Sequence, residues 1–140
     1  MRRYLLDTPI LSAYLQGRRG AVALVDPWIQ NAEAAASALV YAEVVEYLAG
    51  QTNFAQRRRH LHRLLLDVFP YFPTLPILDR YGAIRRQLRP PHGPGLIGDI
   101  DTLIAATAIE KGLTLVTTDG DFSRVPQLSL RVVPRSQLRT

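Results

Sequence analysis

The chain has 140 residues, a formal net charge of +5 and no cysteine. This length is typical of one folded domain, so we expect a single domain over residues 1–140. The lack of cysteine excludes a disulfide scaffold, a thiolate zinc site and a cysteine nucleophile. Hydrophobic residues make up 47% of the chain and charged residues 21%, which excludes an intrinsically disordered protein.

The positive charge comes almost entirely from arginine, with sixteen arginines and a single lysine, Lys111. Arginine binds phosphate in a bidentate manner and stacks on bases, so this bias is compatible with nucleic-acid binding. A biased genomic base composition would give the same excess. Composition alone therefore leaves both explanations open.

No segment of the sequence is typical of export or of a membrane span. The apolar run at residues 4–6 stops at Asp7, which is too short for the core of a signal peptide. No apolar stretch approaches the ~20 residues of a membrane helix. We therefore expect a cytoplasmic protein that does not associate with membranes.

Short strands alternate with helices along the chain. The pattern predicts strands at 4–6, 36–39, 75–78, 113–118 and 130–133. It predicts helices at 8–16, 21–33, 40–48, 53–67, 79–88 and 100–111, and a loop at 89–95. This alternation indicates an α/β fold with a parallel sheet covered on both faces. Ligands of such folds bind beyond the carboxyl ends of the strands.

Half of the twelve acidic residues fall at strand ends or at helix starts. They are Asp7, Glu43, Asp99, Asp101, Asp119 and Asp121. In a doubly wound fold these positions share one rim of the sheet, so we expect the carboxylates to converge there. Clustered carboxylates repel one another and are normally held together by a hard cation such as Mg²⁺ or Mn²⁺.

Glu43 stands out because it lies in an apolar helical stripe. Val40, Glu43, Val44, Tyr47 and Leu48 follow the spacing of a buried helix face. A charged side chain in such a stripe is costly unless a cation or hydrogen bonds compensate it. We therefore expect Glu43 to be functional.

Each acid also has a purely structural interpretation. Asp99 is expected to cap a helix, Asp101 to favour the positive end of that helix, and Asp119 to form a turn. Any one of them could be structural on its own. Several at once on one predicted rim favour a site.

Four segments in order resemble a PIN-domain ribonuclease of the VapC toxin type, from bacterial toxin–antitoxin pairs. They are residues 4–8 (YLLDT), 37–44 (SALVYAEV), 97–106 (IGDIDTLIAA) and 115–122 (LVTTDGDF). The resemblance implies a three-layer α/β/α PIN-like domain with a central, mostly parallel sheet of four to five strands. Each motif alone is weak, but the ordered set at this chain length is specific.

The resemblance implies an acidic metal centre that cleaves RNA phosphodiester bonds. Its catalytic and metal-binding residues would be Asp7, Glu43, Asp101 and Asp119, with Mg²⁺ or Mn²⁺ as the cofactor. Thr117, Asp121 and Asp99 would support these ligands or add to them. A bound cation of this kind activates water and neutralises phosphoryl oxygens.

The resemblance also implies partners: an RNA substrate, a cognate antitoxin protein and a second copy of the chain in a homodimer. We expect the antitoxin to bind apolar surface near the rim, offered by the helix that carries Trp28 and the helix that carries Leu61–Leu65. Two other functions stay open, a housekeeping PIN-type nuclease for RNA maturation or DNA flaps, and a non-catalytic binding module. The basic run at 56–63 could follow an RNA backbone or form the solvated face of a helix.

Overall fold

The computed structural model describes residues 1–139 and contains a five-stranded sheet in which every neighbouring pair is parallel. The strand order is β3-β2-β1-β4-β5. The strands are β1 (Tyr4–Leu6), β2 (Ala34–Ser37), β3 (Phe69–Tyr71), β4 (Thr114–Thr117) and β5 (Leu130–Val132). The predicted α/β class and parallel sheet are therefore confirmed.

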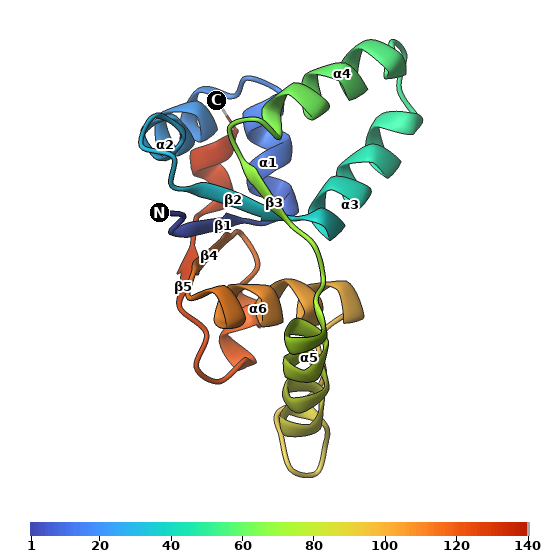
Figure 1. The fold of residues 1–140 in the computed structure, drawn as a ribbon, viewed down its shortest axis with the longest axis vertical. Coiled ribbons are helices and arrows are strands. Elements are labelled where there is room, and N and C mark those ends of the chain that lie inside the picture. Colours follow the sequence, from blue (N-terminus) through green and yellow to red (C-terminus); the bar gives the residue numbers. More distant parts are fainter. Residues whose placement is uncertain (140) are drawn as a thin grey trace.

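Helices cover both faces of this sheet (Figure 1). The helices α1 (Thr8–Leu15), α2 (Arg19–Gln30), α3 (Ala38–Ala49) and α4 (Phe54–Leu64) lie on one side. On the other side lie α5 (Leu75–Leu88) and α6 (Asp99–Lys111), which pack against each other. Two short 3₁₀ helices, η1 (Gly120–Arg124) and η2 (Arg135–Leu138), follow β4 and β5. Within residues 1–139, no helix is long and apolar enough to cross a membrane.

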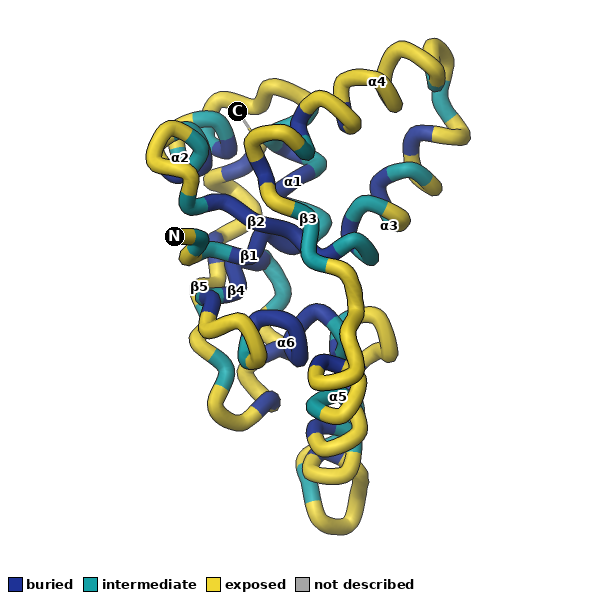
Figure 2. Tube along the Cα trace, in the orientation of Figure 1, coloured by how far each residue is buried: buried dark blue, intermediate teal, exposed yellow. Residues whose placement is uncertain are grey.

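The core is centred on β1, the middle strand of the sheet (Figure 2). Leu5 and Leu6 are fully buried between helices of the two layers, as is Leu115 on the neighbouring strand β4. Leu6 is in register with Val116 of β4, so the two strands end side by side. This register brings the residues that follow both strands to one place on the rim.

The predicted strand at 75–78 is wrong, because these residues form the first turn of α5. Pro76 lies at the start of this helix, where its fixed φ and missing N–H are tolerated. The buried residues Ile77, Ile84 and Leu88 follow a helical spacing, which orients this segment as a helix on the core. The third strand instead lies at Phe69–Tyr71, an edge strand that accommodates Pro70.

Two of the apolar side chains expected on the antitoxin surface, Trp28 and Leu61, are buried. Trp28 is only 8% exposed, and its ring stacks on that of Tyr4 with centroids 4.1 Å apart. Tyr4 begins β1, so Trp28 lies at the end of the strands opposite to the rim. Leu61 is likewise fully buried and offers no surface for a partner.

Candidate active site

Asp7 lies at the carboxyl end of β1 and is the most buried of the predicted acidic ligands, with 5% exposure. Its backbone N–H donates to the carbonyl oxygen of Val116, which continues the ladder between β1 and β4. The Thr117 hydroxyl of β4 donates to Oδ2 of Asp7 at 2.6 Å. Burial raises the pKa of Asp7, and the bonds from Thr117 and the backbone of Thr8 oppose that rise.

Glu43 lies in α3 and faces the start of α1. The hydroxyl of Thr8 donates to Oε1 of Glu43 at 2.6 Å, which ties the carboxylate to the residue that follows Asp7. Within the predicted stripe, Val44 and Leu48 are buried, but Tyr47 is 54% exposed, so its predicted burial is wrong. The buried face of α3 is narrower than its sequence indicates, and Glu43 lies half-buried at its edge.

Asp101 lies in the first turn of α6, on the opposite layer from Glu43. Burial is the largest cause that raises its pKa to about 6, and repulsion from Asp7, Glu43 and Asp119 adds to it. The structural interpretation of Asp99 as the helix cap is wrong, because Gly98 occupies that position. The electrostatic coupling shows that carboxylates from separate elements lie near one another.

Asp119 follows β4 and precedes η1. Its backbone N–H donates to the Thr117 hydroxyl at 3.1 Å, and its Oδ1 accepts from the backbone N–H of Asp121 at 2.8 Å. Thr117 therefore links Asp7 and Asp119 through one hydroxyl group. Oδ1 of Asp119 is occupied by this turn, and Oδ2 takes no part in it.

Two of the predicted supporting acids lie apart from this arrangement. Asp99 is paired with Arg85 of α5 at 2.7 Å and also accepts from the hydroxyl of Tyr81. Asp121 is exposed and lies 3.7 Å from Arg124. Neither side chain lines the pocket described next.

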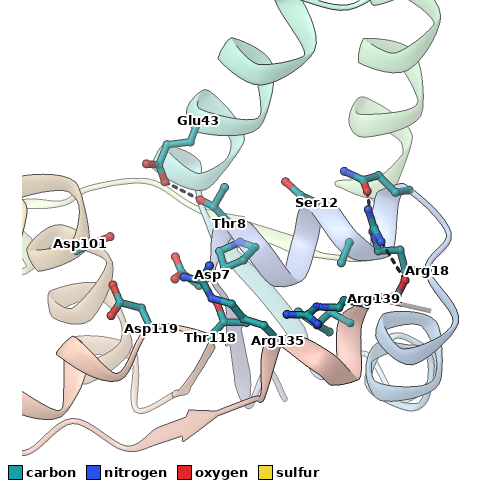
Figure 3. A pocket seen from close by; sticks show the side chains of 14 residues that line it. Asp7, Thr8, Ser12, Arg18, Glu43, Asp101, Thr118, Asp119, Arg135 and Arg139 are labelled. Atoms are coloured by element: carbon teal, nitrogen blue, oxygen red, sulfur yellow. Dashed lines mark hydrogen bonds between the residues drawn. The ribbon is translucent and has the colours of Figure 1, made fainter.

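A pocket of about 590 Å³ brings the four predicted ligands together (Figure 3). Asp7, Glu43, Asp101 and Asp119 line one end of it. The rest of the lining includes residues that the sequence did not single out, among them Ser12, Gln16, Arg18, Arg135 and Arg139. Ser12, Arg18 and Arg139 lie away from the carboxylates, and the side chain of Arg135 extends toward Asp7 (Figure 3). No motif marks these arginines, because they come from the turn after α1 and from the last residues of the chain.

The donor chemistry of the acidic end fits a hard divalent cation. Carboxylate oxygens are the ligands that Mg²⁺ and Mn²⁺ prefer, and none of the four carboxylates forms a salt bridge within residues 1–139. The carboxylates surround the pocket without converging, since no three acidic or histidine side chains in the described part of the chain already form a metal-sized group.

Known structures share the fold of this chain. The chain has a TM-score of 0.81 and 26% identity to a chain of VapBC2 from Rickettsia felis bound to promoter DNA, covering 93% of this chain and 98% of that one. For VapBC-1 from nontypeable Haemophilus influenzae the values are 0.77 and 25%, covering 92% and 96%. For FitAcB from Neisseria gonorrhoeae they are 0.68 and 27%, covering 91% and 95%.

The curated proteins include no significant match to this sequence. The sequence model of the PIN domain matches residues 4–128, which is most of the chain. The similar structures are toxin–antitoxin complexes, so the resemblance drawn from the four motifs is confirmed. The chain belongs to the PIN-domain family.

Proposed function

We propose that the protein is a metal-dependent endoribonuclease and the toxin of a type II toxin–antitoxin pair, acting in the cytoplasm. The observation that carries the proposal is the un-neutralised acidic end of the pocket, where carboxylates from β1, α3, α6 and the segment after β4 face one another. Repulsion among them is part of what raises the pKa of Asp101 to about 6. A divalent cation would relieve that repulsion.

In this proposal Asp7, Glu43 and Asp101 hold Mg²⁺ or Mn²⁺. When bound, such an ion would lower the pKa of a coordinated water and neutralise charge on the phosphoryl oxygens. Thr117 holds Asp7 in place, and Thr8 orients Glu43. Asp119 has Oδ2 to accept a hydrogen bond from the attacking water or to bind a second ion, because its turn uses only Oδ1.

The antitoxin partner is supported by the neighbouring structures, which are VapBC complexes. PIN-domain toxins are nucleases, and the full set of four carboxylates in one pocket favours an active enzyme over a non-catalytic binding module. The choice of RNA over DNA as the substrate rests on the resemblance and needs a direct test.

Cleavage of single-stranded RNA and of DNA of the same sequence by the pure protein tests the proposal. We expect RNA cleavage with Mg²⁺ or Mn²⁺ and none in excess EDTA. Glu43→Gln should abolish most of the activity, whereas Glu46→Gln, an exposed position on the same helix, should retain it. Undiminished cleavage in EDTA would remove the metal, and cleavage of DNA alone would indicate a flap or maturation nuclease.

The toxin assignment has its own test in cells. Expression of the chain alone should slow host growth, and co-expression with the product of a neighbouring antitoxin gene should restore it. The Glu43→Gln variant should not slow growth. Equal toxicity of this variant would show that the growth effect has a cause other than cleavage.

A further inference from the structure

We propose that Arg18, Arg135 and Arg139 form a subsite for an RNA phosphate next to the one that is cleaved. The three arginines line the same pocket as the acidic ligands. Figure 3 shows Arg18 and Arg139 away from the carboxylates, whereas the side chain of Arg135 extends toward Asp7. This inference rests on the proposed nuclease function and specifies how the substrate lies: across the pocket, with the cleaved phosphate at the carboxylates and a flanking phosphate at the arginines.

The pocket is lined by charged side chains of both signs. RNA is a polyanion, and four carboxylates alone would repel it. A bound cation compensates for repulsion only at the acidic end. The guanidinium groups add positive charge to the pocket, and arginine binds phosphate oxygens in a bidentate manner.

Among residues 1–139, no carboxylate neutralises these arginines. Within residues 1–139, Arg18, Arg135 and Arg139 form no salt bridge, even though acidic residues line the same pocket. Arginines elsewhere do pair, as Arg85 does with Asp99. The pocket therefore contains carboxylates that can bind a cation and guanidinium groups that can bind a phosphate.

The fold holds the segment that carries Arg135 and Arg139 in place. A Cβ at Gly20 would lie 1.6 Å from the carbonyl oxygen of Gln137, so α2 and η2 pack together with no room for a side chain. Leu138 of η2 is buried, and Nη1 of Arg18 donates to the carbonyl oxygen of Arg139 at 3.1 Å. These interactions fix the C-terminal segment at the mouth of the pocket.

RNA binding in the absence of cleavage tests the subsite. The experiment measures fluorescence anisotropy of labelled single-stranded RNA in EDTA at several salt concentrations. Arg135→Gln and Arg139→Gln should each weaken binding by about tenfold. The slope of log affinity against log salt should become less steep by about 0.7 for each phosphate that the variant no longer binds. Arg86→Gln, at an exposed position of α5 outside the pocket, should bind like the wild type.

The kinetics of cleavage separate the two ends of the pocket. The arginine variants should raise the RNA concentration for half-maximal rate while largely keeping the maximal rate, because they remove binding and not chemistry. Asp101→Asn should do the opposite, with RNA binding retained or tighter and cleavage abolished. All variants should keep the wild-type melting temperature within a few degrees, because Arg135 and Arg139 are exposed.

Several outcomes would overturn the subsite. If both arginine variants bind RNA with wild-type affinity and salt slope, the subsite is wrong while metal-dependent cleavage by the wild type still supports the proposed function. If an Arg58→Gln variant of α4 shows the whole effect instead, the RNA lies on that helix. If the pocket variants bind RNA normally but escape inhibition by the antitoxin, the arginines bind protein. Conversely, the wild type could cleave no RNA while the arginine variants bind RNA more weakly than it does. That result would support the phosphate subsite and contradict the proposed nuclease activity.

Discussion

Thr117 and Asp7 are joined by a buried hydrogen bond of 2.6 Å, although 110 positions separate them in the chain. The bond exists because β1 and β4 are parallel neighbours whose carboxyl ends lie side by side. The same hydroxyl accepts from the backbone N–H of Asp119. One small side chain therefore positions two of the proposed metal ligands.

Thr117→Val should alter the pH dependence of cleavage. The hydrogen bond from Thr117 lowers the pKa of Asp7 against the larger effect of burial, so its removal should raise that pKa further. Asp7 must be ionised to bind a cation, so the acidic limb of the pH–rate profile should move to higher pH. The free energy of unfolding should fall by about 1–3 kcal/mol, because the buried carboxylate of Asp7 loses the hydrogen bond that Thr117 donates to it. Thr117→Ser keeps the hydroxyl and should resemble the wild type. An unchanged profile for Thr117→Val would show that the bond does not tune Asp7.

Asp101→Asn should change how the stability of the metal-free protein depends on pH. The pKa of Asp101 is raised in the folded state from 3.8 to about 6, so folding favours its protonated form. The corresponding stabilisation is complete below pH 3.8 and is lost as the pH rises through 6. Compared with the wild type, the variant should lose less stability over this window and should be equally or more stable at pH 7. Melting temperatures from pH 4 to pH 8 in EDTA measure this difference.

The same variant separates metal binding from support of the helix. Mn²⁺ should raise the melting temperature of the wild type by mass action and that of Asp101→Asn much less. Cleavage by the variant should fall by about 10² or more, because transition-state charge is no longer stabilised. Asp79→Asn, an exposed carboxylate on α5, is the matched control and should change neither. Wild-type cleavage by Asp101→Asn would contradict its assignment as a ligand.

The parts of the fold that the sequence predicts are those where strong local signals agree with the packing. The apolar strand β1 is followed directly by Asp7, and β4 is followed by Thr118 and then Asp119; both strands are found as expected. The strand β3 carries Pro70 and has only half-buried or exposed residues, so its sequence lacks the signature of a buried strand. Its place in the sheet depends on pairing with β2, which no local pattern reveals.

The acidic end of the pocket could be predicted, whereas the basic end could not. Acids that follow strands share the rim of any parallel sheet, so their meeting follows from fold class. Arg18 and Arg139 meet through a hydrogen bond between the α1–α2 turn and the C-terminal segment. That interaction depends on how η2 packs on α2. No periodicity or motif in the sequence predicts this packing.

The edge of the sheet at β3 suggests where a homodimer would form. Phe69, Phe72, Leu75 and Leu78 occur at every third position and are all exposed, Leu75 by 76%. Several large exposed apolar side chains within one short segment are typical of an interface. We predict a dimer by light scattering coupled to size-exclusion chromatography, and a monomer for Leu75→Glu. Val132→Glu, on the opposite edge strand β5, should remain dimeric. A monomeric wild type, or a dimeric Leu75→Glu variant, would contradict this interface.

Gly20→Ala should weaken RNA binding without removing any charged group. The new Cβ would fall 1.6 Å from the backbone oxygen of Gln137, and backbone cannot move aside as a flexible side chain can. Helix η2 must therefore shift away from α2 and carry Arg135 and Arg139 with it. We expect stability to fall by about 1–3 kcal/mol, as for other overpacked sites. RNA affinity measured well below the melting temperature should fall toward that of the arginine variants.

Gly82→Ala is the matched control for this substitution. Gly82 also lies in a helix, α5, and a Cβ there would meet no atom within 4 Å. Alanine should hold or raise stability by about 0.4–1 kcal/mol, because it restricts the unfolded chain and favours the helix. RNA affinity should stay at the wild-type value. If Gly20→Ala melts earlier but binds RNA as tightly as Gly82→Ala, then the position of η2 does not matter for the substrate and the C-terminal arginines are not part of its site.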